Sequence, residues 1–136
     1  IIDQQKKNTS SGNEKAIEAM HRIKRSAIDM KFALLKGDMQ EFARILGEGW
    51  EDKKKMADAI TNPMIQNVFD TAMSAGALAG KVSGAGGGGF VMLMVEPTRK
   101  KEVIDALNRL DGFVMPFQFT EGGAHGWKIY STDKVK

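Results

Sequence analysis

The stretch KVSGAGGGGF occupies residues 81–90 and places five glycines within the six residues 84–89. It leads directly into FVMLMV, residues 90–95, which is the most apolar run of the chain. Glycine weakens a strand because it has no side chain to pack and loses more backbone entropy on folding. The run is therefore either a linker or a loop whose backbone comes unusually close to another group.

A linker would join polar segments, but this run lies between two apolar strand candidates, residues 77–82 and 90–95. The glycines also match GxGxxG, yet a dinucleotide loop has to open a helix, and here a strand follows. A P-loop would need Lys-Ser or Lys-Thr after Gly89, where the chain has Phe90 and Val91. The remaining interpretation is a loop in which several glycines adopt positive φ angles. Its backbone N–H groups either form an anion-binding concavity or pack under a neighbouring phosphate loop.

Composition predicts one ordinary globular domain spanning residues 1–136. The chain has 42% hydrophobic and 27% charged residues, and it lacks cysteine, which excludes disulfides and thiolate metal sites. The net charge of +3 is mild, and its cations are interleaved with acids, so no nucleic-acid partner is expected. The run 90–95 is too short to span a bilayer, so no membrane partner is expected either. Because the chain opens on Ile1 rather than methionine, we expect a fragment of a longer cytoplasmic protein.

The first half of the chain is predicted to be helical. Ser11 with Glu14 matches a capping box. The helix that follows ends near Gly37 and has a predicted apolar stripe at spacings of four and three, made of Ala16, Met20, Ile23, Ala27, Met30 and Leu34.

Two further helices follow in the same half. Asp38 with Glu41 signals the start of the second, which presents Phe42, Leu46 and Trp50 on one face. Thr61-Asn62-Pro63 offers a cap and a proline at the first helical position of the third helix, which ends near Gly76. Its apolar positions are Ile65, Val68, Phe69 and Ala72.

The second half changes to the period of a strand. Strands are predicted at 77–82 and 90–95, followed by an amphipathic helix over 98–110. FVMPFQF, residues 113–119, alternates at period two, although Pro116 favours an edge position or a bulge. A glycine turn and a last strand, WKIY at 127–130, end the pattern. The sequence therefore predicts an α+β fold whose N-terminal half is helical.

The glycine stretch resembles the third motif of the GHMP small-molecule kinases. Lys81, Ser83 and the whole run 84–89 match that motif position by position, and Phe90 replaces its common cysteine. The stretches 4–24, 47–63 and 122–130 are similar to the sugar-kinase branch of the family that acts on heptose 7-phosphate. The resemblance covers essentially the whole chain.

This resemblance implies a ferredoxin-like α/β sandwich, the fold of the family's C-terminal lobe. It implies transfer of the γ-phosphoryl group of ATP, with Mg²⁺, to a sugar phosphate of the heptose 7-phosphate type, in bacterial synthesis of nucleotide-activated heptose. The family's Gly-Leu-x-Ser-Ser phosphate loop is missing from these 136 residues. We therefore expect that the N-terminal ATP-binding lobe is a partner absent from the chain and that the isolated chain is inactive.

The resemblance also supplies the candidate site. It assigns the active-site glycine loop that faces the ATP phosphates to Ser83, Gly84, Ala85, Gly86, Gly87, Gly88 and Gly89. Lys81 is a candidate phosphate contact, although a solvated lysine is the commoner role of such a residue. No residue is nominated for catalysis or for metal binding.

Several alternatives remain open at this point. The loop either touches ATP or supports the phosphate loop of the other lobe, and neither the sugar nor a homodimer is decided by the sequence. A different class of function is an independent ferredoxin-like module, regulatory or RNA-binding, whose exposed sheet face would be the site.

Overall fold

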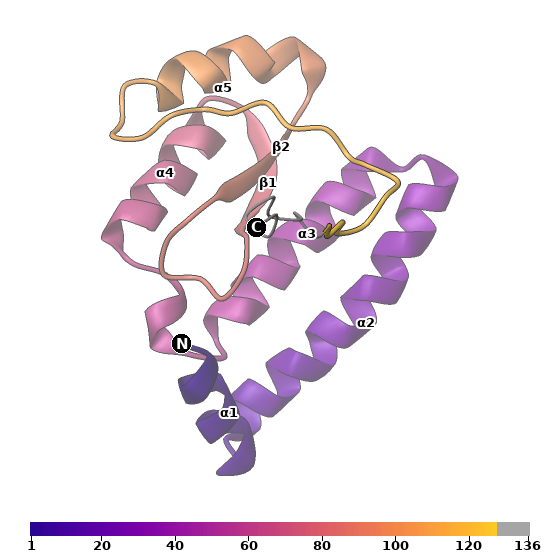
Figure 1. Cartoon of the computed structure of the whole chain (residues 1–136), viewed down its shortest axis with the longest axis vertical. Helices are drawn as coiled ribbons and strands as arrows, with labels where there is room; N and C mark the ends of the chain where they lie inside the picture. The colour runs from indigo at the N-terminus through magenta and orange to yellow at the C-terminus, as the bar shows by residue number, and fades with distance from the viewer. Residues whose placement is uncertain (128–136) are drawn as a thin grey trace, which may run out of the picture.

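A computed structural model of the chain describes residues 1–127 (Figure 1). Its α-helices are α1 Ile2–Ser10, α2 Glu14–Lys36, α3 Met39–Lys54, α4 Pro63–Ser74 and α5 Lys100–Leu107. Short 3₁₀ turns precede α4 and α5, η1 at Asp58–Ile60 and η2 at Pro97–Arg99. The strands are β1 Ala77–Val82 and β2 Val91–Val95. The predicted α+β class and helical first half are confirmed.

β1 and β2 form an antiparallel pair that has helices on both faces. Ala79 pairs with Met94 and Gly80 with Leu93. A Cβ built on Gly47 of α3 would lie 3.6 Å from the Ala79 Cβ, so α3 covers that face. On the opposite face, Gly80 lies against Phe69 of α4. β2, half-buried along its length, therefore contributes apolar side chains to both layers.

The largest apolar cluster joins α3, α4 and the sheet. Trp50 and Phe69 stack nearly parallel, with ring centroids 5.3 Å apart and planes 9° apart. Ile60 and Val82 are fully buried beside them. The predicted faces of the second and third helices are confirmed, because Leu46, Trp50, Ile65, Phe69 and Ala72 are buried and Phe42 and Val68 are half-buried.

The predicted stripe on α2 is half right: Ala16 is buried, and Ile23 and Met30 are half-buried. The other three positions are wrong, because Met20, Ala27 and Leu34 are exposed, whereas Ala19 and Ala33 are buried. The sequence does not show which of these positions are covered, because α2 carries more apolar residues than its contact with α3 can bury. The side that packs in the structure runs through small side chains, which let α2 lie close to α3.

Local side-chain chemistry sets three helix starts. The predicted capping box at Ser11 is wrong: Asn13 is the cap, and its side chain accepts from the Ala16 N–H at 3.2 Å. Ser11 instead donates to the Asn8 carbonyl at the end of α1, a helix that the sequence analysis did not predict. Asp38 and Asn62 cap α3 and α4 as predicted, accepting from Glu41 and Ile65 at 3.0 and 2.9 Å.

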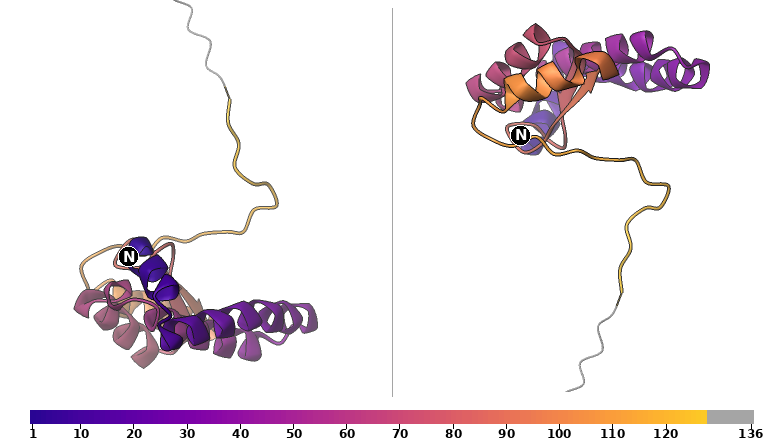
Figure 2. Two further views of the ribbon diagram at one scale, coloured as in Figure 1. Left: turned by 90° about the horizontal axis from the view of Figure 1, so that it is seen from below. Right: turned by 90° about the horizontal axis from the view of Figure 1, so that it is seen from above.

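The predicted strand at 113–119 is also wrong. These residues pair with no strand among residues 1–127, and Figure 2 shows the segment after α5 passing the body and then leading away from it. Phe113 and Phe119 are 77% and 91% exposed. Alternation stabilises a strand only when one face is buried and a partner supplies the ladder, and Pro116 lacks one ladder donor. Most of the predicted strand at 127–130 lies outside the described residues.

A partly buried ion cluster fastens α2 to the C-terminal end of α3. The Arg22 Nε contacts both carboxylate oxygens of Asp52 at 2.9 and 3.0 Å, and the Lys55 Nζ lies 2.9 Å from one of them. Burial by itself raises the pKa of Asp52, but the hydrogen bonds and charges of Lys55 and Arg22 outweigh it. The pKa is therefore lowered.

Asp52→Asn should make the domain less stable at neutral pH and less sensitive to acid. Because the pKa of Asp52 is lower in the folded state, its contribution is complete above the unfolded value of about 3.9 and is lost as the pH falls through the folded value. The substitution should cost about 1–3 kcal/mol at pH 7 and flatten the stability profile below about pH 4. Urea unfolding across this pH range measures both effects. Asp105→Asn, at a surface pair on α5, is the control and should cost less than about 1 kcal/mol.

Candidate active-site loop

The glycine stretch forms one continuous loop between β1 and β2. The Ser83 N–H donates to the Phe90 carbonyl at 2.8 Å and closes the base of the loop. All the predicted loop residues therefore lie together, with Lys81 two residues before the closure on β1. The loop itself is exposed or half-buried.

The middle of the loop is held by the segment that connects η1 to α4. The Gly87 N–H donates to the Ile60 carbonyl at 2.8 Å, and the Asn62 side-chain amide donates to the Gly87 carbonyl at 3.1 Å. Asn62 is also the cap of α4. The loop is therefore fixed in place by its own domain and is not a linker.

Two of the glycines are required by this close packing. Gly86 has φ +106, and a Cβ there would lie 2.8 Å from the Ile60 carbonyl oxygen and 3.0 Å from its Cα. Gly87 has φ +76, and a Cβ there would lie 3.2 Å from the Ala59 carbonyl oxygen. Any other residue would combine an unfavourable backbone conformation with a clash against backbone atoms.

The ends of the loop are open. A Cβ built on Gly84, Gly88 or Gly89 would meet no described atom within 4 Å. Among residues 1–127, no acceptor receives the N–H groups of Gly84, Ala85, Gly86, Gly88 and Gly89. These donors remain free for solvent or for an anionic ligand.

Two lysines lie at the entrance of this loop. Lys81 is half-buried on β1, and the Lys53 Nζ from α3 donates to the Gly84 carbonyl. Burial and the nearby positive charge of Lys81 both lower the pKa of Lys53. The loop entrance is therefore a positively charged region built from two elements.

The sequence analysis missed Lys53 and the contact of Asn62 with the loop. Lys53 lies in a run of three lysines that reads as a solvated helix end, and 31 residues separate it from Gly84. Asn62 was predicted only as a cap. The local sequence predicts neither contact, because both depend on how α3 and the η1–α4 connection pack beside the loop.

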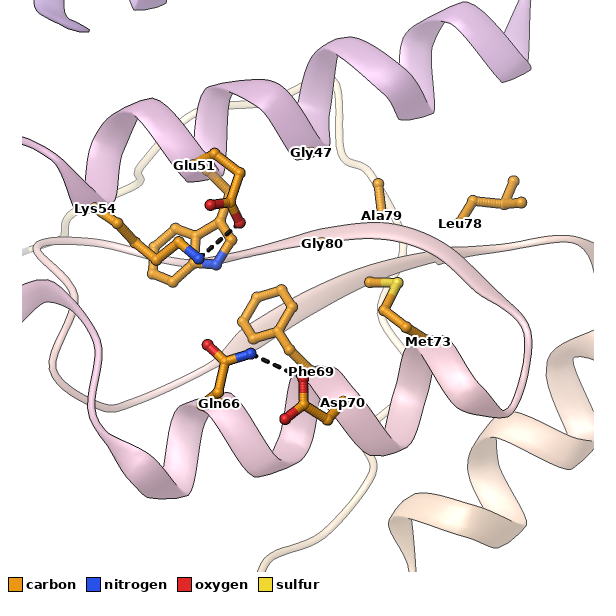
Figure 3. Close-up of a pocket in the computed structure, with 11 residues that line it drawn as sticks. Gly47, Glu51, Lys54, Gln66, Phe69, Asp70, Met73, Leu78, Ala79 and Gly80 are labelled. Carbon is orange, nitrogen blue, oxygen red and sulfur yellow. Dashed lines mark hydrogen bonds and ion pairs between the residues drawn. The ribbon is translucent and has the colours of Figure 1, made fainter.

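A groove of about 260 Å³ lies apart from the glycine loop, between α3 and α4 over β1 (Figure 3). Gly47 and Gly80 leave it open, and Phe69 and Met73 line one wall. Its polar rim groups pair with one another, Lys54 with Glu51 and Gln66 with Asp70. The groove contains none of the predicted site residues, and its polar groups are already satisfied.

The described residues offer no obvious place for a metal ion. Within residues 1–127, no three His, Asp or Glu side chains come together as a set of ligands. The Mg²⁺ that the family resemblance implies therefore has no fitting site in this part of the chain. None of the helices in the same range has the length and hydrophobicity to cross a membrane.

The structure is thus a helix-covered α+β domain whose fixed glycine loop lies beside two lysines. The family model for the C-terminal domain of GHMP kinases matches residues 30–111, which include α3, α4, the loop and α5. The chain belongs to the GHMP kinase family, and it corresponds to the C-terminal domain of that family.

Two similar proteins and one solved structure agree with this assignment. D-glycero-alpha-D-manno-heptose 7-phosphate kinase of Campylobacter jejuni is 42% identical over 128 residues, covering 94% of this chain and 38% of that protein. L-fucokinase/L-fucose-1-P guanylyltransferase of Bacteroides fragilis is 29% identical over 80 residues, 59% of this chain and 8% of that protein. A crystal structure of a sugar kinase from Campylobacter jejuni matches with a TM-score of 0.60 and 43% identity, covering 78% of this chain and 32% of that one. The chain thus spans well under half of each relative.

Proposed function

We propose that this chain is the C-terminal domain of an ATP-dependent sugar-phosphate kinase of the heptose 7-phosphate type, acting in the cytoplasm. The glycine loop carries the proposal: its middle is fixed by Ile60 and Asn62, while its open ends keep backbone donors free beside Lys53 and Lys81. Phosphoryl transfer depends mainly on positioning and on neutralising phosphate charge, and such a loop contributes to both. The similarity to a heptose 7-phosphate kinase over 94% of the chain supports the choice of substrate.

In this proposal the loop forms one wall of a cleft whose other wall is an N-terminal lobe. The described residues supply neither a second phosphate loop nor a set of carboxylates for Mg²⁺, so no catalytic step is assigned to a metal here. The isolated chain should consequently have no kinase activity. The alternative of an RNA-binding sheet gains no support, because both faces of β2 pack against helices.

An activity assay tests this proposal. The full-length gene product that contains this chain should transfer phosphate from Mg²⁺·ATP to D-glycero-D-manno-heptose 7-phosphate, with a lower kcat/KM for L-fucose. The 136-residue chain alone should show no turnover and at most millimolar binding of Mg²⁺·ATP by calorimetry. Preference of the full-length protein for fucose would contradict the heptose assignment. A micromolar ATP site on the isolated chain would contradict the proposal that ATP binding requires the N-terminal lobe.

A further inference from the structure

The C-terminal end of α3 carries three consecutive lysines that have different partners. The Lys54 Nζ pairs with Glu51 at 2.6 Å, and the Lys55 Nζ pairs with Asp52 at 2.9 Å. Lys53 instead donates to a carbonyl of the glycine loop. Within residues 1–127, no carboxylate forms an ion pair with Lys53.

Lys81 brings a second unpaired cation to the same place. It lies on β1 just before the loop, and no carboxylate of the described part of the chain pairs with it either. Lys53 reaches the Gly84 carbonyl, three residues after Lys81, so both lysines lie at the same end of the loop. Burial lowers the pKa of Lys53, and the charge of Lys81 lowers it further. Placing two partly buried cations together is unfavourable unless an anion binds between them.

The chemistry of the loop entrance favours an oxyanion of high charge. An ammonium group has three donors, and the Gly84 carbonyl uses one of those on Lys53. The remaining lysine donors, together with the free N–H groups of the loop, match the several acceptor oxygens of a phosphate dianion. A neutral sugar hydroxyl would not offset the repulsion between the two lysines.

We propose that Lys53 and Lys81 form a two-lysine site that binds a phosphate group of a substrate at the entrance of the glycine loop. The proposal rests on the proposed kinase function and adds Lys53 to its binding residues. The phosphate belongs either to the sugar phosphate or to the nucleotide, since both present the same group. Lys53 also holds the Gly84 carbonyl, so binding of the phosphate and placement of the loop are linked through one side chain.

Steady-state kinetics on the full-length enzyme test the site. Lys53→Gln and Lys81→Gln should each raise one KM about 10- to 100-fold, the effect of losing one charge-assisted hydrogen bond. A rise in the KM for the sugar phosphate assigns the site to the acceptor, and a rise in the KM for ATP assigns it to the nucleotide. Lys53→Arg should restore most of the affinity, because it keeps the charge. Lys54→Gln, one residue away on α3, is the matched control and should change neither KM by more than about twofold.

A second measurement separates this proposal from the proposed kinase function. Inorganic phosphate titrated into the full-length protein should shift the NMR signals of the Lys53 and Lys81 side chains and of the loop amides in a saturable manner. Either lysine-to-glutamine variant should abolish saturation while its thermal melt stays within about 3 °C of the wild type. Saturable shifts in a protein with no sugar-kinase activity would support the anion site and refute the kinase proposal. Active enzyme whose KM values do not respond to either variant would overturn the two-lysine site.

Discussion

Gly86→Ala is expected to lower the free energy of unfolding by about 2–6 kcal/mol. The residue has φ +106, which alone costs an L-residue about 1–3 kcal/mol. The new methyl group would also lie 2.8 Å from the Ile60 carbonyl oxygen and 3.0 Å from the Ile60 Cα. Backbone atoms of a buried residue cannot move aside cheaply, and such overpacking adds about 1–3 kcal/mol. Urea unfolding of the variant and the wild type measures the difference.

Gly89→Ala is the matched control within the same loop. Its φ of +92 is also unfavourable for alanine, but its Cβ would meet no described atom within 4 Å. It should therefore cost only the conformational part, about 1–3 kcal/mol. If the two variants are equally stable, the contact between the loop and Ile60 contributes nothing, and the loop is positioned by its ends alone.

Trp50→Ala should cost about 3–5 kcal/mol, the usual loss for truncating a buried aromatic residue. Trp50 is 4% exposed, and its ring stacks on Phe69 at 5.3 Å where α3, α4 and the sheet meet. Alanine would leave a cavity that the helices cannot close without separating from β1. Denaturant unfolding monitored by circular dichroism gives the value.

Trp127→Ala provides the comparison for this prediction. Its side chain is 81% exposed, so removal should change stability by no more than about 0.5 kcal/mol. A loss below about 1 kcal/mol for Trp50→Ala, with Trp127→Ala unchanged, would mean that the stacked pair is not the centre of the core.

The elements that were predicted correctly depend on short-range chemistry. β1 is observed over the predicted 77–82, because this mostly apolar run lies between the turn residues Gly76 and Ser83-Gly84. The caps Asp38 and Asn62 were also correct, since a cap needs only a side-chain acceptor within three residues of an N–H group.

The errors arose where distant packing decides the outcome. Half of the α2 stripe was wrong because Met20, Ala27 and Leu34 are apolar but exposed, and only the position of α3 decides which residues of α2 are covered. The strand at 113–119 failed because alternation cannot supply a pairing partner. Lys53 was missed for the same reason: its proximity to the loop exists only after α3 and β1 have packed together.

The sequence predicted which residues form the glycine loop, but not which contacts hold the loop. The residues 83–89 were identified from their glycine content and their resemblance to a kinase motif, and their contact with phosphate stays a prediction. The sequence did not reveal that Gly86 and Gly87 face their own domain while Gly84, Gly88 and Gly89 face open space. That difference divides the run into a fixed middle and open ends.

Asn62 gives this division a dynamic consequence. Its side-chain oxygen caps α4, while its amide nitrogen holds the Gly87 carbonyl, so one side chain joins the first turn of a helix to the centre of the loop. Fraying of that helix turn and release of the loop are then parts of one local opening event. The loop should be as rigid as the start of α4 allows, and its mobility is governed from a helix that lies outside the glycine motif.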